Sequence, residues 1–96
     1  MPILMIHDAP GGTQEQYEEA GKRISGGEGL NALSDWPVDG ILFHAAGPTE
    51  NGWRVVDVWE SEEAFESFGP TIGPILQELD FPGEPKLFPL HNVVTE

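Results

Sequence analysis

The amino-acid sequence predicts an α+β fold of the ferredoxin-like type, in which four strands form an antiparallel sheet and two helices cover one of its faces. Short apolar runs bounded by glycine, proline and asparagine indicate four strands. Two segments with helical periodicity lie between the first two and between the last two strands. Asn51-Gly52 is a hairpin signal between the second and third strands. These observations give the order β-α-β-β-α-β and one domain over residues 1–96.

The first strand is expected at residues 3–9, where an apolar run ends at Pro10-Gly11-Gly12. A helix should follow, because Thr13 and Gln16 have the spacing of a capping box. Its apolar positions recur at intervals of three and four residues, at Tyr17, Ala20, Gly21 and Ile24. Ser25-Gly26-Gly27 is expected to end this helix.

Residues 28–39 are expected to form a loop, in which Trp36 is a candidate flap or plug. The second strand is predicted at residues 40–46, and a turn at residues 48–52 joins it to the third. The third strand is apolar on both faces, as strands buried on both sides are. One face carries Trp53, Val55 and Trp59, interrupted by Asp57, and the other carries Val56 and Val58.

Ser61 is expected to cap the second helix, and the acidic residues that follow it suit a helix N-terminus. Phe65 and Phe68 should point inward. Gly69-Pro70 should break the helix, after which an apolar stripe resumes at Ile72, Ile75, Leu76 and Leu79. The last strand is predicted at residues 86–94, and Pro89 places it at a sheet edge or a bulge.

Two helices can cover only one face of a four-stranded sheet, yet the third strand is apolar on both faces. A second copy of the same sheet, related by a two-fold axis, is the simplest cover for the other face. The pattern therefore predicts a homodimer in which Val56 and Val58 face the partner.

The chain has 17 acidic and 4 basic side chains among its 96 residues, and its formal net charge is −13. Phosphate backbones and anionic lipid surfaces would repel such a chain, so neither nucleic acid nor a membrane is expected as a partner. The chain has no cysteine, and no apolar run approaches the ~20 residues of a membrane span. Because its start also lacks the basic residues of a signal peptide, a soluble and cytoplasmic protein is expected.

The hairpin carries a candidate catalytic pair, His44 and Asp57. A four-residue loop from Thr49 to Gly52 would place the two directly opposite each other. A two-residue loop would place His44 opposite Trp59 with Asp57 on the diagonal, and an odd loop or a bulge would move His44 to the other face. In a pair, Asp57 would fix the imidazole tautomer and make His44 a general base for an acidic C–H or O–H. The two residues could equally satisfy each other in a half-buried hairpin without any catalytic role.

Several aromatic side chains are candidate ligand contacts, because they would offer flat apolar walls to an aromatic or polycyclic ligand. The candidate substrate-binding residues are Trp59, Trp53, Tyr17, His91 and Phe65. Tyr17 could equally be a core residue. His91 and His7 could each line a pocket, and each could instead be a solvated or interface histidine. The three histidines lack metal-ligand spacing, and no flavin or nicotinamide site is recognisable, so neither a metal nor a cofactor is predicted.

The order of elements and the segment DVWESEEAF at residues 57–65 resemble the dimeric α/β-barrel superfamily, especially its antibiotic-biosynthesis-monooxygenase-like branch. In that family the third strand commonly ends in an aromatic residue, followed by an acidic-Ser-acidic helix start and a phenylalanine. The resemblance covers nearly the whole chain. It implies a dimer whose sheets form an α/β barrel, and a small ligand between sheet and helices, on the face where Trp59 should point.

Members of that family include cofactor-independent monooxygenases of polyketide quinols, heme-degrading oxygenases, polyketide cyclases and isomerases. The heme degraders need a histidine on the second helix, which residues 61–79 do not contain. The cyclase-like members use strand histidines as acid–base groups, which His44 and His91 could supply together with Asp57.

The resemblance and the candidate pair predict a small-molecule enzyme of the monooxygenase or cyclase type, acting on an aromatic or polyketide-like substrate without a bound cofactor. The alternative is a non-catalytic ligand-binding or interaction module of the same fold. An enzyme requires His44 and Asp57 to be within hydrogen-bond reach and to open into a cavity. A space filled by Phe65, Phe68 and Trp36 would instead seal the pair.

Overall fold

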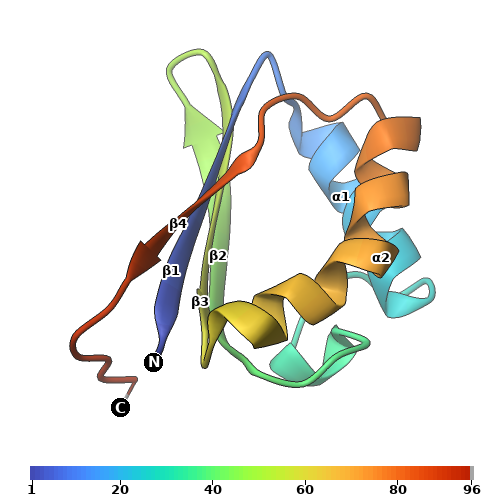
Figure 1. Cartoon of the computed structure of the whole chain (residues 1–96). Coiled ribbons are helices and arrows are strands. Elements are labelled where there is room, and N and C mark those ends of the chain that lie inside the picture. Colours follow the sequence, from blue (N-terminus) through green and yellow to red (C-terminus); the bar gives the residue numbers. More distant parts are fainter. Residues whose placement is uncertain (96) are drawn as a thin grey trace.

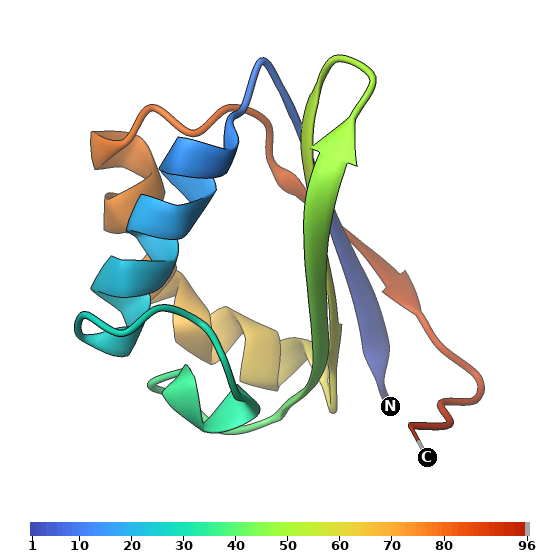
Figure 2. The same ribbon diagram turned by 180° about the vertical axis from the view of Figure 1, so that it is seen from behind.

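The computed structural model describes residues 1–95 and confirms the order β-α-β-β-α-β. The elements are β1 (Ile3–Pro10), α1 (Gln14–Ser25), a short 3₁₀ turn (Leu33–Asp35), β2 (Ile41–Thr49), β3 (Gly52–Trp59), α2 (Glu62–Glu78) and β4 (Pro85–Pro89). The strands form one sheet in the order β2-β3-β1-β4, and every neighbouring pair is antiparallel. Both helices lie on the same side of this sheet (Figures 1 and 2).

Local capping chemistry fixes the start and the end of α1 as predicted. The Thr13 hydroxyl accepts a hydrogen bond from the Gln16 backbone N–H at 3.1 Å, and the Gln16 side chain accepts one from the Thr13 N–H at 3.0 Å. Gly26 ends the helix in the left-handed conformation, with φ +85°, which only glycine adopts without strain.

The hairpin is tighter than the predicted turn. Thr49 pairs with Gly52, so Glu50 and Asn51 alone form the loop, and β2 continues beyond its predicted end at residue 46. A Cβ on Gly52 would lie 2.1 Å from the backbone oxygen of Ala9, so only glycine fits where the hairpin meets the end of β1. This two-residue loop has the same centre as a loop from Thr49 to Gly52, so the strands keep the register expected for the longer loop and His44 lies directly opposite Asp57. The expectation that a two-residue loop would set His44 opposite Trp59 is therefore wrong.

The second helix is continuous, and the predicted break at Gly69-Pro70 is wrong. Both Pro70 and Pro74 lie inside α2, and each is preceded by a glycine. A proline ring in a helix clashes with the Cβ of the residue before it, and Gly69 and Gly73 have no Cβ. Each proline still removes one helical hydrogen bond, and helices bend at such positions. In Figure 1, α2 changes direction along its length, so that its first half approaches the sheet and its second half runs beside α1.

The last strand lies at the sheet edge, where Pro89 led us to expect it, but it is shorter than predicted. It pairs only with β1 and ends at Pro89, not at residue 94. Proline has no N–H to donate to a ladder. The Leu90 N–H, just after β4, donates to the carbonyl of Pro2, just before β1, at 2.9 Å. Beyond it, residues 91–95 form no strand.

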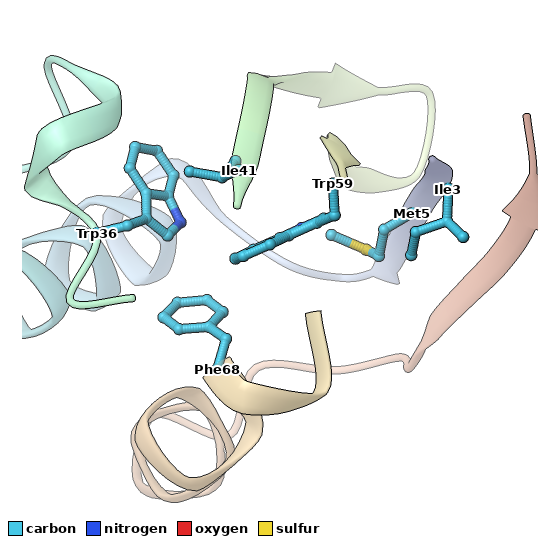
Figure 3. Packing of buried hydrophobic residues seen from close by; sticks show 6 residues of the cluster. All are labelled: Ile3, Met5, Trp36, Ile41, Trp59 and Phe68. Atoms are coloured by element: carbon cyan, nitrogen blue, oxygen red, sulfur yellow. The ribbon is translucent and has the colours of Figure 1, made fainter. Parts of the chain in front are cut away.

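The buried core lies between the sheet and the helices, as Figure 3 shows. Its buried members are Ile3, Met5, Trp36, Ile41, Trp59 and Phe68. Trp36 is therefore a core residue, 7% exposed, and not a free flap. The opposite face of the sheet is less well covered, because Phe43 and Phe88 are 47% and 43% exposed there.

Candidate functional site

A chain of hydrogen bonds links α1 to the sheet through four side chains. The Tyr17 hydroxyl lies 2.5 Å from His44 Nε2, and His44 Nδ1 lies 2.6 Å from Asp57 Oδ1. The other carboxylate oxygen accepts a hydrogen bond from Trp59 Nε1 at 3.2 Å. The structure thus brings together His44 and Asp57 as the sequence suggested, and it adds Tyr17 as a third member.

Two features of the fold position this chain. The β2–β3 register sets His44 opposite Asp57, with both side chains on the helix-covered face. Tyr17 lies one turn into α1, on its apolar stripe, where it faces the sheet. Trp36 touches His44 edge-on with ring centroids 4.8 Å apart, and Trp53 packs against Tyr17 at 5.5 Å. Aromatic contacts therefore hold both hydrogen-bonded rings in place.

The partners of His44 determine where the protons lie. An ionised carboxylate only accepts hydrogen bonds, so with Asp57 charged the imidazole carries its proton on Nδ1. The lone pair on Nε2 then accepts the hydrogen bond that the Tyr17 hydroxyl donates. Burial raises the pKa of Tyr17 above its ordinary value of 10.0, and the charge of Asp57 raises this pKa further, so the hydroxyl keeps its proton at neutral pH.

The hydrogen-bonded chain borders a cavity of about 290 Å³ between the sheet and the two helices. Four polar side chains line it, namely His7, Tyr17, His44 and Asp57. The remaining lining is apolar or glycine and includes Met5, Val55, Phe65, Phe68, Ile72 and Leu76. An apolar cavity with a few convergent polar groups is the usual form of a small-molecule site. Phe65, Phe68 and Trp36 form walls of this space and do not fill it.

The predicted substrate-binding residues divide into two groups. Tyr17 and Phe65 line the cavity, as expected. Trp59, Trp53 and His91 do not line it. Trp59 is completely buried because its ring fills the core between Phe65 and Phe68, and its indole N–H holds Asp57. Trp53 lies behind Tyr17, and His91 is exposed beyond the end of β4.

His7 lines the cavity, which is one of the two positions that the sequence left open for it. Residues two apart in a strand lie on the same face, so Met5, His7 and Ala9 share the buried face of β1. This period of two was the sequence signal that favoured a buried His7. Within residues 1–95, no group of three or more histidine and carboxylate side chains is placed to hold a metal ion. None of the helices described is long and apolar enough to cross a membrane.

Comparison with solved structures gives the fold a known counterpart. Two crystal structures of SnoaB, a cofactor-independent oxygenase from Streptomyces nogalater, superpose with TM-scores of 0.64 and 0.63. In both cases the sequence identity is 17%, and the match covers 99% of this chain and 97% of SnoaB. The chain shares the fold of SnoaB. The predicted resemblance to the antibiotic-biosynthesis-monooxygenase-like fold is thereby confirmed, at an identity that speaks for the fold alone.

The structure of another protein has the same fold with lower similarity. It is a conserved protein of unknown function from Bacteroides thetaiotaomicron, described as a possible oxidoreductase. It is 14% identical, the match covers 91% of this chain and 92% of that one, and the TM-score is 0.50. No family model and no curated protein matches the sequence.

Proposed function

We propose that this protein is a small-molecule enzyme that removes a proton from an aromatic or polyketide-like substrate held in the cavity between sheet and helices. The observation that carries this proposal is the Tyr17–His44–Asp57 hydrogen-bond chain at the edge of an apolar cavity. A pair that merely satisfied itself in the hairpin would need neither the tyrosine nor the open space beside it.

The geometry supports a relay and not direct contact between His44 and the substrate. Both nitrogens of His44 already have partners, so a substrate proton reaches the imidazole through the Tyr17 hydroxyl. The tyrosine oxygen takes the substrate's proton while its own proton moves to His44 Nε2. Asp57 stabilises the imidazolium that forms, because it already accepts the hydrogen bond from Nδ1. His44 is then the base, Tyr17 the group that touches the substrate, and Asp57 the residue that orients His44.

The apolar walls assist this step by excluding water from the substrate anion. A delocalised aromatic anion is an electron-rich species that can react in two ways. In a monooxygenase, it gives electrons to O₂, one oxygen atom enters the substrate as a carbonyl, and the other leaves as water. In a cyclase, the same carbanion attacks a carbonyl of its own chain and forms a C–C bond. The likeness to SnoaB, an oxygenase that uses no cofactor, favours the first outcome.

The direct test is turnover of a panel of anthrones, quinols and polyketide analogues, followed by product analysis and by O₂ consumption. We expect Tyr17→Phe and His44→Ala to lower kcat by about 10²–10⁴, the usual worth of general acid–base catalysis. Product formation without O₂ uptake would identify a cyclase or isomerase. Binding without turnover by the wild type would show a ligand-binding module, and equal turnover by wild type and both variants would remove the relay from the mechanism.

We also propose that the protein is a homodimer that buries the outer face of its sheet. The helices cover one face, and on the other Phe43 and Phe88 are largely exposed while Val56 and Val58 are half-buried. An apolar sheet face of this kind is usually covered by a partner. Sedimentation equilibrium should give twice the chain mass, and Phe43→Asp should shift the equilibrium toward the monomer. A wild-type monomer at high concentration would contradict this proposal.

A further inference from the structure

Of the four polar side chains that line the cavity, His7 is the one that the proton relay does not use. His7 is 6% exposed and lies on the helix-covered face of β1. It pairs across the sheet with Val55, whereas His44 pairs with Asp57, two residues further along β3. Two inter-strand spacings of about 4.8 Å and a two-residue offset put the Cα atoms of the two histidines roughly 12 Å apart. His7 and His44 therefore line the same cavity from strands on either side of β3.

The loop before β4 holds the imidazole of His7 in one orientation. His7 Nε2 lies 2.8 Å from the Pro82 carbonyl oxygen, and the Phe81 ring packs against the imidazole with centroids 5.2 Å apart. The next residue, Gly83, has a φ of +82°, and a Cβ there would lie 2.1 Å from the Asp8 carbonyl oxygen and 3.3 Å from His7 Nε2. Only glycine fits at this position, where the loop passes close to the backbone beside His7.

This arrangement fixes the role of the other ring nitrogen. A carbonyl oxygen only accepts, so Nε2 carries the proton and, in the neutral ring, Nδ1 is left as an acceptor. Nδ1 makes no hydrogen bond to any residue in 1–95. Across the same residues, the one completely buried side-chain nitrogen or oxygen without a partner is Trp53 Nε1, so Nδ1 of His7 keeps accessible surface. A residue that lines the cavity thus carries an acceptor that no residue in 1–95 occupies.

We propose that His7 Nδ1 accepts a hydrogen bond from a hydroxyl group of the ligand. The ligand is then a flat aromatic molecule of two or three rings with a hydroxyl at the end remote from Tyr17. Met5 and Val55 form an apolar floor between the two polar ends, which suits a ring system. The cavity of about 290 Å³ is at the lower end of the range for ligand sites, which limits the number of rings. This inference rests on the proposed function for the identity of the reacting end.

The test crosses two ligands with three forms of the protein. The ligands are 2,6-dihydroxynaphthalene and 2-hydroxynaphthalene, which differ by one remote hydroxyl. The proteins are the wild type, His7→Phe, which keeps a flat ring but has no acceptor, and His7→Gln. The glutamine amide can donate to the Pro82 carbonyl and still offer an oxygen to the ligand. Dissociation constants are measured by calorimetry under nitrogen, so that no oxidation takes place.

We expect the wild type to bind the diol roughly three- to tenfold more tightly than the mono-alcohol, as one net hydrogen bond allows. His7→Phe should lose this preference and bind the two ligands with equal affinity, and His7→Gln should retain at least part of the preference. Binding of the mono-alcohol by His7→Phe also shows that this variant folds with a cavity that accepts the ring system.

Two results would overturn the assignment of His7. The first is an equal preference for the diol in wild type and His7→Phe, which would leave the proposed proton relay untouched. The second is a parallel loss of affinity for both ligands in His7→Phe, which would show a structural role only. Failure of the wild type to bind either naphthol would overturn both this inference and the aromatic ligand on which it rests. Turnover by the Tyr17 and His44 variants tests the relay separately.

Discussion

Asp57 offers the sharpest test of the hydrogen-bond chain, because two substitutions there have very different consequences. Asp57 is 3% exposed, and its carboxylate accepts hydrogen bonds from His44 Nδ1 at 2.6 Å and from Trp59 Nε1 at 3.2 Å. Asp57→Ala leaves both donors buried without an acceptor. Each such loss costs about 1–3 kcal/mol, so the alanine variant should lose about 2–6 kcal/mol of unfolding free energy.

Asp57→Asn should be far milder, because the chain can reverse its direction. The amide oxygen still accepts from Trp59, and the amide N–H₂ donates to His44 Nδ1 once the imidazole proton moves to Nε2. Nε2–H then donates to the Tyr17 oxygen, and among the wild-type groups only the Tyr17 O–H, at the edge of the cavity, loses its acceptor. Replacing charged by neutral hydrogen bonds should cost about 1 kcal/mol. The reversed imidazole cannot accept the Tyr17 proton, so kcat should fall by about 10²–10⁴.

Thermal unfolding, imidazole ¹⁵N shifts and turnover measure the three parts of this prediction. In a domain of this size, about 1 kcal/mol moves Tm by about 4–8 °C, so Asp57→Ala should melt at least ~8 °C below the wild type. Asp57→Asn should melt closer to the wild type and show the proton on Nε2. Equal destabilisation of the two variants, or an Asn variant with wild-type turnover, would refute the reversible chain.

Three further predictions concern Tyr17, Gly52 and Pro70. Tyr17 is the only tyrosine of the chain, so the absorbance of tyrosinate reports its titration directly. Its pKa should exceed 10.0, and Asp57→Asn should lower it without removing the effect of burial, which is the larger cause. Because the pKa of Tyr17 is higher in the folded than in the unfolded state, the neutral hydroxyl contributes stability that is fully present below pH 10.0 and is lost as the pH rises through the folded pKa. Tyr17→Phe should therefore lose less unfolding free energy at alkaline pH than the wild type, as measured by denaturant titration. The same dependence of unfolding free energy on pH in both proteins would contradict this prediction. Gly52→Ala should lower the unfolding free energy by several kcal/mol, since a Cβ would lie 2.1 Å from the Ala9 oxygen. Gly47→Ala is the matched control, because a Cβ there meets nothing within 4 Å. An unchanged unfolding free energy in Gly52→Ala would argue against the hairpin contact. Pro70→Ala should restore a helical hydrogen bond and raise the unfolding free energy by about 1–3 kcal/mol. It should also straighten α2 and thereby weaken ligand binding. A variant that is less stable than the wild type would show that packing at the bend outweighs the helix propensity.

The sequence by itself determined the elements whose chemistry is local. Thr13 and Gln16 start α1, Ser61 starts α2, and Asn51-Gly52 marks the hairpin, because each depends on hydrogen bonds and backbone angles within a few residues. The alternation along β3 predicted a sheet with two apolar faces. The hairpin also restricted His44 and Asp57 to a few possible registers, of which the structure has one.

Other features depended on contacts between segments far apart in the chain. Tyr17 joins His44 only because α1 packs across the sheet, and His7 acquires its orientation from a loop 75 residues later. Trp59 looked like a pocket wall, but core packing takes its ring completely out of the cavity, and its N–H supports Asp57. Helix α2 passes through two prolines that local rules treat as breaks, because the glycines before them remove the clash. Spacing along the chain decides which face a side chain occupies, but only the packed structure decides which partner it meets there.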